Sequence, residues 1–489
     1  MTRGSRWGWL VLGGLAAFGG SVFSEFHFDD YGMLQDPAVV SGNGWARCWS
    51  WLQTRPLSWF SFWLNYQASG REAWLWHAVN VALHIACCLV LYRILRRVMP
   101  RVALAGSLIF AVHPILAESV DYVYARATVL CALFSLLALD EWIGGRDWRC
   151  VAWFVPAVLA KEECVSVTLV LALYSMVRGE LRRRAAAIAA MLAISAAAGL
   201  RVMAAIQATG VKGVGANAGI SPVQYLSEQG IVILRYIGLV VFPWFFSVDA
   251  EIPRPEWIWR GLAWAILAGL IAIAAMRLRD ARASFWILAG LILLIPSSSI
   301  FPAADLAADR RMYLPMLAFA PAIALLAGDR ARWVWVAAGV LALVSIERTY
   351  VWASDARLWG EAVALAPEKV RPRIQLARAV SPREALPLLL EGERMAPQNA
   401  DVATELARVY VELGRNGEAL AEAGRALALA PGDAQALNNR GAVLQAMNQT
   451  AAARRDFLQA LRREPCLQEA RENLERSGGV PGEAPTCGR

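Results

Sequence analysis

Two adjacent carboxylates are the first residues of this sequence whose types and spacing could support chemistry. Asp29 and Asp30 lie in the segment FHFDDYGMLQDP (26–37), which follows the first apolar run of the chain. A carboxylate at the outer surface of a membrane could accept a proton from an attacking hydroxyl group, or hold a metal ion or an acceptor. Aspartate pairs are also common in solvated loops, so this pair indicates a functional site only together with other charged residues.

Further charged residues lie at the ends of later apolar runs, in HPILAESVDYVYARATVL (113–130), AKEE (160–163) and AADLAADRRMYLP (303–315). A charge inside a membrane protein is costly, so each is a candidate for function unless it only anchors the chain at the interface. The candidates are Glu118, Arg126, Lys161, Asp309, Arg310 and Arg311. An outer-facing site that gathered these residues would suit a phosphate-linked donor and a hydroxyl acceptor, because cations stabilise a leaving phosphate and a carboxylate deprotonates the nucleophile.

All four histidines lie in the first quarter of the chain, at positions 27, 77, 84 and 113. His77 and His84 are seven residues apart and therefore share one face of a helix, where a divalent metal ion is conceivable. Hydrogen bonding between helices is the simpler interpretation and the one we favour. The eight cysteines form neither a CxxC pair nor a disulfide framework. The sequence therefore assigns no certain cofactor.

The chain that must position these residues has 489 residues, of which 57% are hydrophobic and only 18% charged. A soluble protein of this length rarely has so little charge, which favours a membrane protein. The net charge is +8, and the basic residues are nearly all arginines that cluster between apolar runs. This distribution is typical of membrane topology and argues against nucleic acid as a partner.

Apolar runs of roughly the 20 residues that span a bilayer recur up to residue 346. We expect about eleven spans, near 7–24, 74–95, 102–118, 127–143, 150–161, 164–178, 185–203, 257–276, 285–301, 314–328 and 333–347. No A-x-A cleavage site follows the first run, so we expect a retained helix and not a signal peptide. The fifth and sixth runs are short and meet at AKEE, which indicates a site within the membrane.

Arginine clusters occur in every second loop between these runs, and they predict the orientation of the chain. Cytoplasmic loops carry an excess of basic residues, so we expect the N-terminus inside and the C-terminal part outside. The apolar segment 224–246 would invert every later loop if it crossed the membrane. We therefore expect a re-entrant or interfacial helix there. In a bacterium, the chain would lie in the inner membrane with its candidate site in the periplasm.

The sequence becomes periodic after residue 347. Residues 401–434 and 435–468 are two segments of 34 residues, and prolines 397, 431 and 465 share that period, which is the signature of tetratricopeptide (TPR) repeats. The positions expected to pack between helices are Leu406, Tyr410, Ala419, Ala423, Ala426, Leu444, Ala453, Phe457 and Ala460. About three and a half such repeats would form a concave surface that binds a protein segment.

We therefore expect an all-α protein with three parts. A polytopic membrane domain covers 1–347, an α-solenoid of TPR repeats covers 348–475, and a tail covers 476–489. The last residues of the tail are rich in glycine and proline and are expected to be disordered.

Several short motifs, taken in their order, resemble the transmembrane and tetratricopeptide-repeat O-mannosyltransferases, a family of C-type (GT-C) glycosyltransferases. The motifs are FDD (28–30), RPLSWFSFWLNY (55–66), HAVNVALH (77–84), HPILAESV (113–120), AKE (160–162) and DRRMYLP (309–315). The resemblance covers nearly the whole chain and implies a GT-C-type helical domain. It also implies a sugar donor on a polyprenyl phosphate, which is dolichyl-phosphate mannose in eukaryotes and would be an undecaprenyl-phosphate sugar in a bacterium.

The resemblance also implies roles for single residues. The catalytic acid of the family falls on Asp29 or Asp30, and an acid of the second outer loop falls on Glu118. The residues that would meet the lipid phosphate are Arg126, Lys161 and Arg310, and those that would support the site are His77, His113, Asp309 and Arg311. Where the family tends to have GRAD, this chain has ARAT (125–128). Thr128 thus replaces an acid, which affects the acceptor contact or the sugar specificity.

These features predict an inverting membrane glycosyltransferase. It would move one sugar from a polyprenyl phosphate to a serine or threonine hydroxyl of a protein, on the non-cytoplasmic side. Two alternatives stay open. The same chemistry could act on a lipid or glycan acceptor, with the repeats used for assembly with partners. A membrane-anchored TPR scaffold without catalysis would need no charged outer cavity, so the acids and cations above argue against it.

Overall fold

The computed structural model describes residues 3–209, 220–252, 256–279, 281–299, 301–303, 305–328, 331–479 and 482–486. Every regular element in these residues is helical, which confirms the predicted all-α class. The chain divides into two compact units, Met1–Ser354 and Asp355–Arg489. Each unit is described by itself below.

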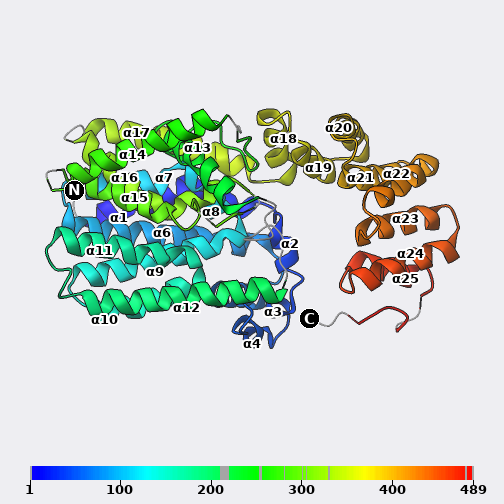
Figure 1. Ribbon diagram of the computed structural model, residues 1–489, viewed down its shortest axis with the longest axis horizontal. Coiled ribbons are helices and arrows are strands. Elements are labelled where there is room, and N and C mark those ends of the chain that lie inside the picture. The colour runs from blue at the N-terminus through cyan, green and yellow to red at the C-terminus, as the bar shows by residue number, and fades with distance from the viewer. Residues whose placement is uncertain are drawn as a thin grey trace. The chain divides into compact units, whose positions relative to one another are not determined.

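The first unit is a bundle of long helices (Figure 1). The helices of the bundle are α1 (Arg3–Phe18), α6 (Ala73–Val98), α7 (Ala103–Val112), α9 (Arg126–Ile143), α10 (Asp147–Ala160), α11 (Val167–Val177), α12 (Ala185–Thr209), α13 (Pro222–Val241), α14 (Trp257–Met276), α15 (Arg282–Leu294), α16 (Tyr313–Ala327) and α17 (Ala331–Val351). Helix α9 packs between α6 and α10, and α15 packs on α16. These contacts build the core of the unit.

The apolar helices of this unit differ in how deeply they are buried. In the segments Val123–Ile143 and Asp309–Ala327, which include α9 and α16, 72% of the apolar window is buried. In α12 and α14 the buried share is only 11% and 17%, although these helices are more apolar than the other two. A helix that is apolar all round must be covered by protein or by lipid. Helices α9 and α16 therefore form the core, whereas α12 and α14 present the surface that a bilayer would cover.

Six helical segments in the described part of the chain are long and apolar enough to cross a membrane, or seven if the bent pair of α7 and Pro114–Asp121 counts as one. The number of qualifying helices is smaller than the predicted number of about eleven spans. Helices α10, α11 and α15 have only 14, 11 and 13 residues. At 1.5 Å per residue, 14 residues extend about 21 Å, less than the ~30 Å of a hydrocarbon core. Helix α13, which covers most of 224–246, is not among the six.

Short helices gather at one end of the bundle, where α9 begins and α10 ends (Figure 1). They are α2 (Asp29–Met33), α3 (Pro37–Val40), α4 (Gly44–Cys48), α5 (Pro56–Ser69) and α8 (Ala117–Asp121). The hydroxyl of Ser58 in α5 donates to the carbonyl of Ala160 at the end of α10, at 2.8 Å. At the opposite end of α9, Asp140 pairs with Arg93 and Arg97 at 2.8 and 2.7 Å. The two ends of the bundle therefore carry different sets of charged residues.

The second unit is an array of antiparallel helices. Its helices are α18 (Asp355–Leu365), α19 (Val370–Ala379), α20 (Pro382–Met395), α21 (Ala400–Glu412), α22 (Asn416–Leu429), α23 (Ala434–Ala446), α24 (Thr450–Arg463) and α25 (Gln468–Arg476). Two of these helices, α21 and α23, begin with a side-chain cap. Asn399 accepts a hydrogen bond from the backbone N–H of Asp401 at 2.9 Å, and Asp433 accepts one from the backbone N–H of Ala436 at 2.7 Å. Such N-caps satisfy backbone donors that a helix start leaves free.

The predicted packing positions lie inside this array. Eight of the nine are buried, and Leu444 is partly buried against the same core. The pair α23–α24 shows why its sequence is constrained. A Cβ atom at Gly441 would meet the ring of Phe457 at 2.5 Å, so only glycine allows this close approach. The 34-residue period therefore corresponds to TPR helix pairs.

Candidate active site

The two adjacent aspartates have different surroundings. Asp30 is fully buried, and its carboxylate accepts hydrogen bonds from the backbone N–H groups of His27 at 3.0 Å and Tyr124 at 2.8 Å. Burial raises the pKa of Asp30 to about 7, although these hydrogen bonds act in the opposite direction. Asp29 is exposed, and its carboxylate accepts a hydrogen bond from the hydroxyl of Tyr122 at 2.8 Å. Asp29 thus has an oriented carboxylate within reach of a ligand, whereas Asp30 fixes the loop.

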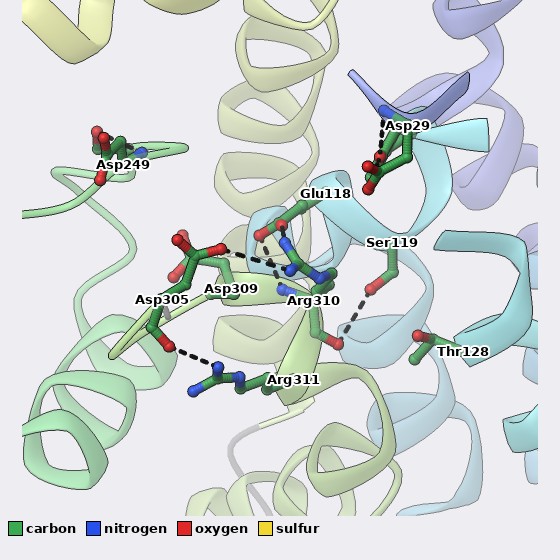
Figure 2. A network of polar contacts seen from close by, with 12 residues as sticks. Asp29, Glu118, Ser119, Thr128, Asp249, Asp305, Asp309, Arg310 and Arg311 are labelled. Carbon is green, nitrogen blue, oxygen red and sulfur yellow. Dashed lines mark hydrogen bonds and ion pairs between the residues drawn. The ribbon is translucent and has the colours of Figure 1, made fainter. Parts of the chain in front are cut away.

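Glu118 and Arg310 form the centre of a polar network (Figure 2). The backbone N–H of Arg310 donates to one carboxylate oxygen of Glu118 at 2.9 Å, and the guanidinium of Arg310 pairs with the other. The hydroxyl of Ser119 donates to the carbonyl of Arg310 at 3.3 Å. The side chain of Glu118 is 6% exposed and that of Arg310 is 35% exposed. Glu118 therefore orients Arg310, and part of the guanidinium stays accessible.

The two neighbours of Arg310 are tied to other segments. Asp309 pairs with Arg235 of α13 at 2.9 Å. Arg311 is buried and donates to the hydroxyl of Tyr225 at 3.1 Å and to the carbonyl of Asp305 at 2.7 Å. These contacts anchor the DRR segment to α13 and to the chain before it. Only the middle residue of the three has a partly accessible cation.

A small pocket adjoins this network. Its cavity volume is about 10 Å³, and its wall includes Glu118, Asp309, Arg348 and Trp352. The ring of Trp352 stacks on Tyr122 with ring centroids 6.0 Å apart, and Tyr122 in turn holds Asp29. The pocket is thus linked to the exposed carboxylate through two aromatic side chains. A cavity of this volume has room for about one water molecule and is far smaller than the roughly 300–1,000 Å³ of drug-sized ligand sites.

Lys161 lies between α10 and α11, as the short apolar runs predicted. Its ammonium group donates to the hydroxyl of Thr128 at 2.8 Å and pairs with Glu163 at 2.9 Å. Thr128 is the residue that replaces an acid in the ARAT motif. Since a hydroxyl carries no charge, this replacement leaves Lys161 less neutralised than a second carboxylate would.

Arg126 does not face the pocket that the sequence predicted for it. Its side chain is fully buried and donates to the side-chain oxygens of Asn80 at 2.7 Å and Asn65 at 2.8 Å, and to the carbonyl of Trp76 at 3.0 Å. The guanidinium also lies over the ring of Phe62 at 5.1 Å. In this arrangement Arg126 joins α5, α6 and α9, because each of these contacts comes from α5 or α6.

Two residues at this end were missed by the sequence reasoning. Arg55 and Glu162 form a two-pronged pair, with nitrogen–oxygen distances of 3.0 and 2.6 Å. Burial favours the neutral form of Glu162, but the charge of Arg55 outweighs it and lowers the pKa of Glu162 to about 2. Arg55 opens the RPLSWFSFWLNY motif and Glu162 follows Lys161, so both residues were visible as part of a motif. Their pairing depends on the packing of α5 against α10.

The histidines lie in hydrogen bonds with protein groups. His84 contacts the hydroxyl of Tyr313 at 2.8 Å, His77 the carbonyl of Glu25 at 3.3 Å, and His113 the carbonyl of Val240 at 3.1 Å. Among the described residues, no group of three or more His, Cys, Asp or Glu side chains could hold a metal ion. The contacts agree with the favoured interpretation, in which these histidines connect helices.

Comparison with known proteins gives the following similarities. No family model matches the chain. The chain is 24% identical over 400 residues to a protein O-mannosyl-transferase of Caenorhabditis elegans, which covers 73% of this chain and 57% of that protein. It is 33% identical over 161 residues to protein O-mannosyl-transferase TMTC1 of Homo sapiens, which covers 29% of this chain and 18% of that protein. The chain thus spans little more than half the length of the worm protein and less than a fifth of the human one.

Solved structures give only weak overlaps. The alignment with the crystal structure of yeast Tom70 covers 82% of this chain and 88% of the Tom70 chain, at 13% identity and with a TM-score of 0.24. The alignment with the APC/C hetero-tetramer Cut9-Hcn1 covers 87% of this chain and 90% of the compared chain, at 13% identity and with a TM-score of 0.22. Scores this low support no conclusion. The sequence relatives, in contrast, confirm the resemblance predicted from the motifs: over nearly three quarters of its length, this chain is similar to the TMTC protein O-mannosyl-transferases.

Proposed function

We propose that the chain is a membrane glycosyltransferase that moves one sugar from a polyprenyl phosphate to a serine or threonine hydroxyl of a protein. The observation that carries this proposal is the grouping at one end of the bundle. The exposed carboxylate of Asp29 is held by Tyr122, which stacks on Trp352 in the wall of the small pocket. The partly accessible guanidinium of Arg310 pairs with Glu118, which lines the same pocket. A base for the acceptor hydroxyl and a cation for the leaving phosphate are parts that such a transfer requires.

In the proposed reaction, Asp29 accepts the proton of the acceptor hydroxyl while the hydroxyl oxygen attacks the anomeric carbon. The new bond forms as the bond from that carbon to the phosphate oxygen breaks, and the configuration inverts. The hydroxyl of Tyr122 holds the carboxylate of Asp29 in place. Arg310 stabilises the charge that develops on the leaving phosphate.

Lys161 is the second proposed phosphate ligand. It is held by Thr128 and Glu163, and its neighbour Glu162 is already paired with Arg55. Because Thr128 is neutral, more of the charge of Lys161 is available to a phosphate. Glu118 and Asp309 act as positioning residues, since their carboxylates hold Arg310 and Arg235. Arg311, His77 and His113 fix the surrounding segments through their hydrogen bonds.

The proposed orientation has the active end on the non-cytoplasmic side. The other end of the bundle carries Arg93, Arg97 and Arg184, of which Arg184 donates to the carbonyl of Trp142 at 2.9 Å. Basic residues of this kind favour the cytoplasmic face. In a bacterium this arrangement corresponds to the inner membrane with a periplasmic site and an undecaprenyl-phosphate donor. The TPR unit is then the proposed binding surface for the acceptor protein.

The decisive experiment compares neighbouring aspartates. Asp29→Asn should lower the transfer rate about 10²–10⁴-fold, the usual contribution of a general base, while the protein still inserts into membranes. Asp36→Asn is the matched control, because Asp36 only caps α3 through the backbone N–H of Ala38 at 2.8 Å and asparagine caps equally well. Sugar transfer from a radiolabelled polyprenyl-phosphate donor to protein is the measurement. Equal rates for Asp29→Asn and Asp36→Asn would remove Asp29 as the base.

A further inference from the structure

An exposed aromatic segment lies at the end of the bundle where the short helices gather. Trp45, Trp49, Trp51 and Leu52 lie in and directly after α4, and each is between 45% and 68% exposed. The site proposed above does not use these side chains. A group of large exposed apolar side chains marks a surface that another molecule or a membrane covers.

The segment is packed on its other side. The thiol of Cys48 is buried and donates to the carbonyls of Ala38 and Gly44 at 3.5 Å each. A Cβ atom at Gly44 would clash with the carbonyl oxygen of Ala38, so only glycine lets α4 lie this close to α3. The ring of Trp49 contacts that of Phe60 in α5, with ring centroids 5.9 Å apart. The exposed tryptophans therefore belong to a segment that α3 and α5 hold in place.

Arg201 joins this segment to α12. Its guanidinium donates to the carbonyls of Ser50 at 3.1 Å and Trp51 at 3.2 Å, and also to that of Gln53. It lies over the ring of Trp51 as well, 5.9 Å from the centroid. Helix α4 and the chain after it are thus found beside the second half of α12 (Figure 1). Because only 11% of the apolar window of α12 is buried, the aromatic segment continues a surface that a bilayer would cover.

The composition of the surrounding chain agrees with a lipid surface. No acidic residue occurs between Asp36 and Glu72, a stretch that contains three arginines and five tryptophans. Tryptophan is enriched at the level of the lipid headgroups, where its ring is apolar and its N–H meets water. One basic residue near an anionic bilayer favours binding about fivefold, and Arg47 is exposed within the segment. Together with the contact to α12, this composition favours lipid over a second protein.

We propose that residues 44–53 dock on the bilayer surface at this end of the bundle, with the rings of Trp45, Trp49 and Trp51 among the lipid headgroups. The chain then has a membrane contact that is not a spanning helix. Arg201 fixes the depth of this contact, because its backbone belongs to α12 and its guanidinium binds three carbonyls of the docked segment. The contact with lipid does not depend on the proposed transferase activity.

The depth of the segment is measured on the full chain in nanodiscs that hold one copy each. Trp51→Cys is labelled with an environment-sensitive fluorophore, and the unchanged chain, whose six free cysteines are buried, gives the background. A nitroxide on the lipid headgroup should quench this label severalfold more strongly than a nitroxide deep in the acyl chain. Leu192→Cys in the exposed middle of α12 should show the reverse order, and Ala421→Cys on the surface of α22 should be quenched by neither.

Quenching at position 51 as low as that at position 421 would overturn the docking. A label that is shielded only in discs with two copies would overturn it too, and would identify a contact between copies. Trp45→Cys provides a second position if Trp51→Cys does not fold.

The role of Arg201 is tested with Arg201→Met in the chain labelled at position 45. Headgroup quenching should fall, because three carbonyls lose their donor, whereas Arg178→Met at the opposite end of the bundle should leave it unchanged. Equal quenching in both variants would overturn Arg201 as the residue that fixes the depth. All of these measurements are made without a sugar donor, so their failure would leave the transferase proposal to its own test at Asp29.

Discussion

Replacing Arg126 by methionine should lower the stability of the membrane unit much more than its affinity for a donor. The resemblance to O-mannosyltransferases implies that Arg126 meets a lipid phosphate. In the structure its guanidinium is fully buried and donates to Asn80, Asn65 and the carbonyl of Trp76. These two descriptions predict opposite outcomes for Arg126→Met, so the variant decides between them.

The expected loss follows from the contacts that methionine cannot make. Two buried amide oxygens and one carbonyl lose a charged donor, and each buried group left unpaired costs about 1–3 kcal/mol. Relief of the buried charge offsets part of this cost, so a net loss of about 3–5 kcal/mol is reasonable. At roughly 2 °C per kcal/mol for a large domain, the unfolding midpoint should fall by about 6–10 °C. Arg126→Lys should recover little of it, because an ammonium group does not reproduce the planar fork.

The assay is thermal unfolding of the detergent-solubilised full chain, measured beside the binding of a polyprenyl-phosphate donor at a temperature where all variants are folded. Arg71→Met is the control, because Arg71 is exposed and its contact to the carbonyl of Leu34 is long, at 3.4 Å. It should change stability by no more than about 0.5 kcal/mol. If Arg126→Met kept the unfolding midpoint but lost donor binding, the positioning role would be refuted and the phosphate role supported.

Two further outcomes are expected. Burial raises the pKa of Asp30 from 3.8 to about 7, so its contribution to stability should be fully present below about pH 4 and lost as the pH rises through about 7. Between about pH 4 and 7, the free energy of unfolding should therefore change less with pH in Asp30→Asn than in the unchanged protein. The same pH dependence in both proteins would contradict this prediction. A chain that ends at Ser354, where the first unit ends, should hydrolyse the donor but no longer modify the protein acceptor. Undiminished protein modification by that shorter chain would exclude the repeats as the acceptor surface.

Local and periodic features were predictable from the sequence. The packing positions Leu406, Ala419 and Phe457 are buried as expected, because a 34-residue period places the same residue types in the same helix contacts. The bend at His113 likewise has a local cause, since Pro114 cannot continue a helix. The structure bends there by 53°. Such features depend on neighbours in the sequence.

Features that depend on distant contacts were not predictable. Asp29 and Asp30 look alike in the sequence, and the contacts that distinguish them include Tyr122 and Tyr124, which lie more than 90 residues away. The burial of Arg126 likewise depends on partners in two other helices. In each case the deciding contact joins segments that only the folded chain brings together.

The shortness of α10 has a consequence for the surrounding lipid. Its 14 residues extend about 21 Å, so a helix that starts at one surface of a ~30 Å hydrocarbon core ends below the other surface. Lys161 and Glu162 follow directly, where Glu163 and Thr128 bind the ammonium of Lys161 and Arg55 pairs with Glu162. Because α10 is shorter than the hydrocarbon core, a bilayer that surrounded it would have to thin beside it, at a cost of a fraction of a kcal/mol per ångström of mismatch.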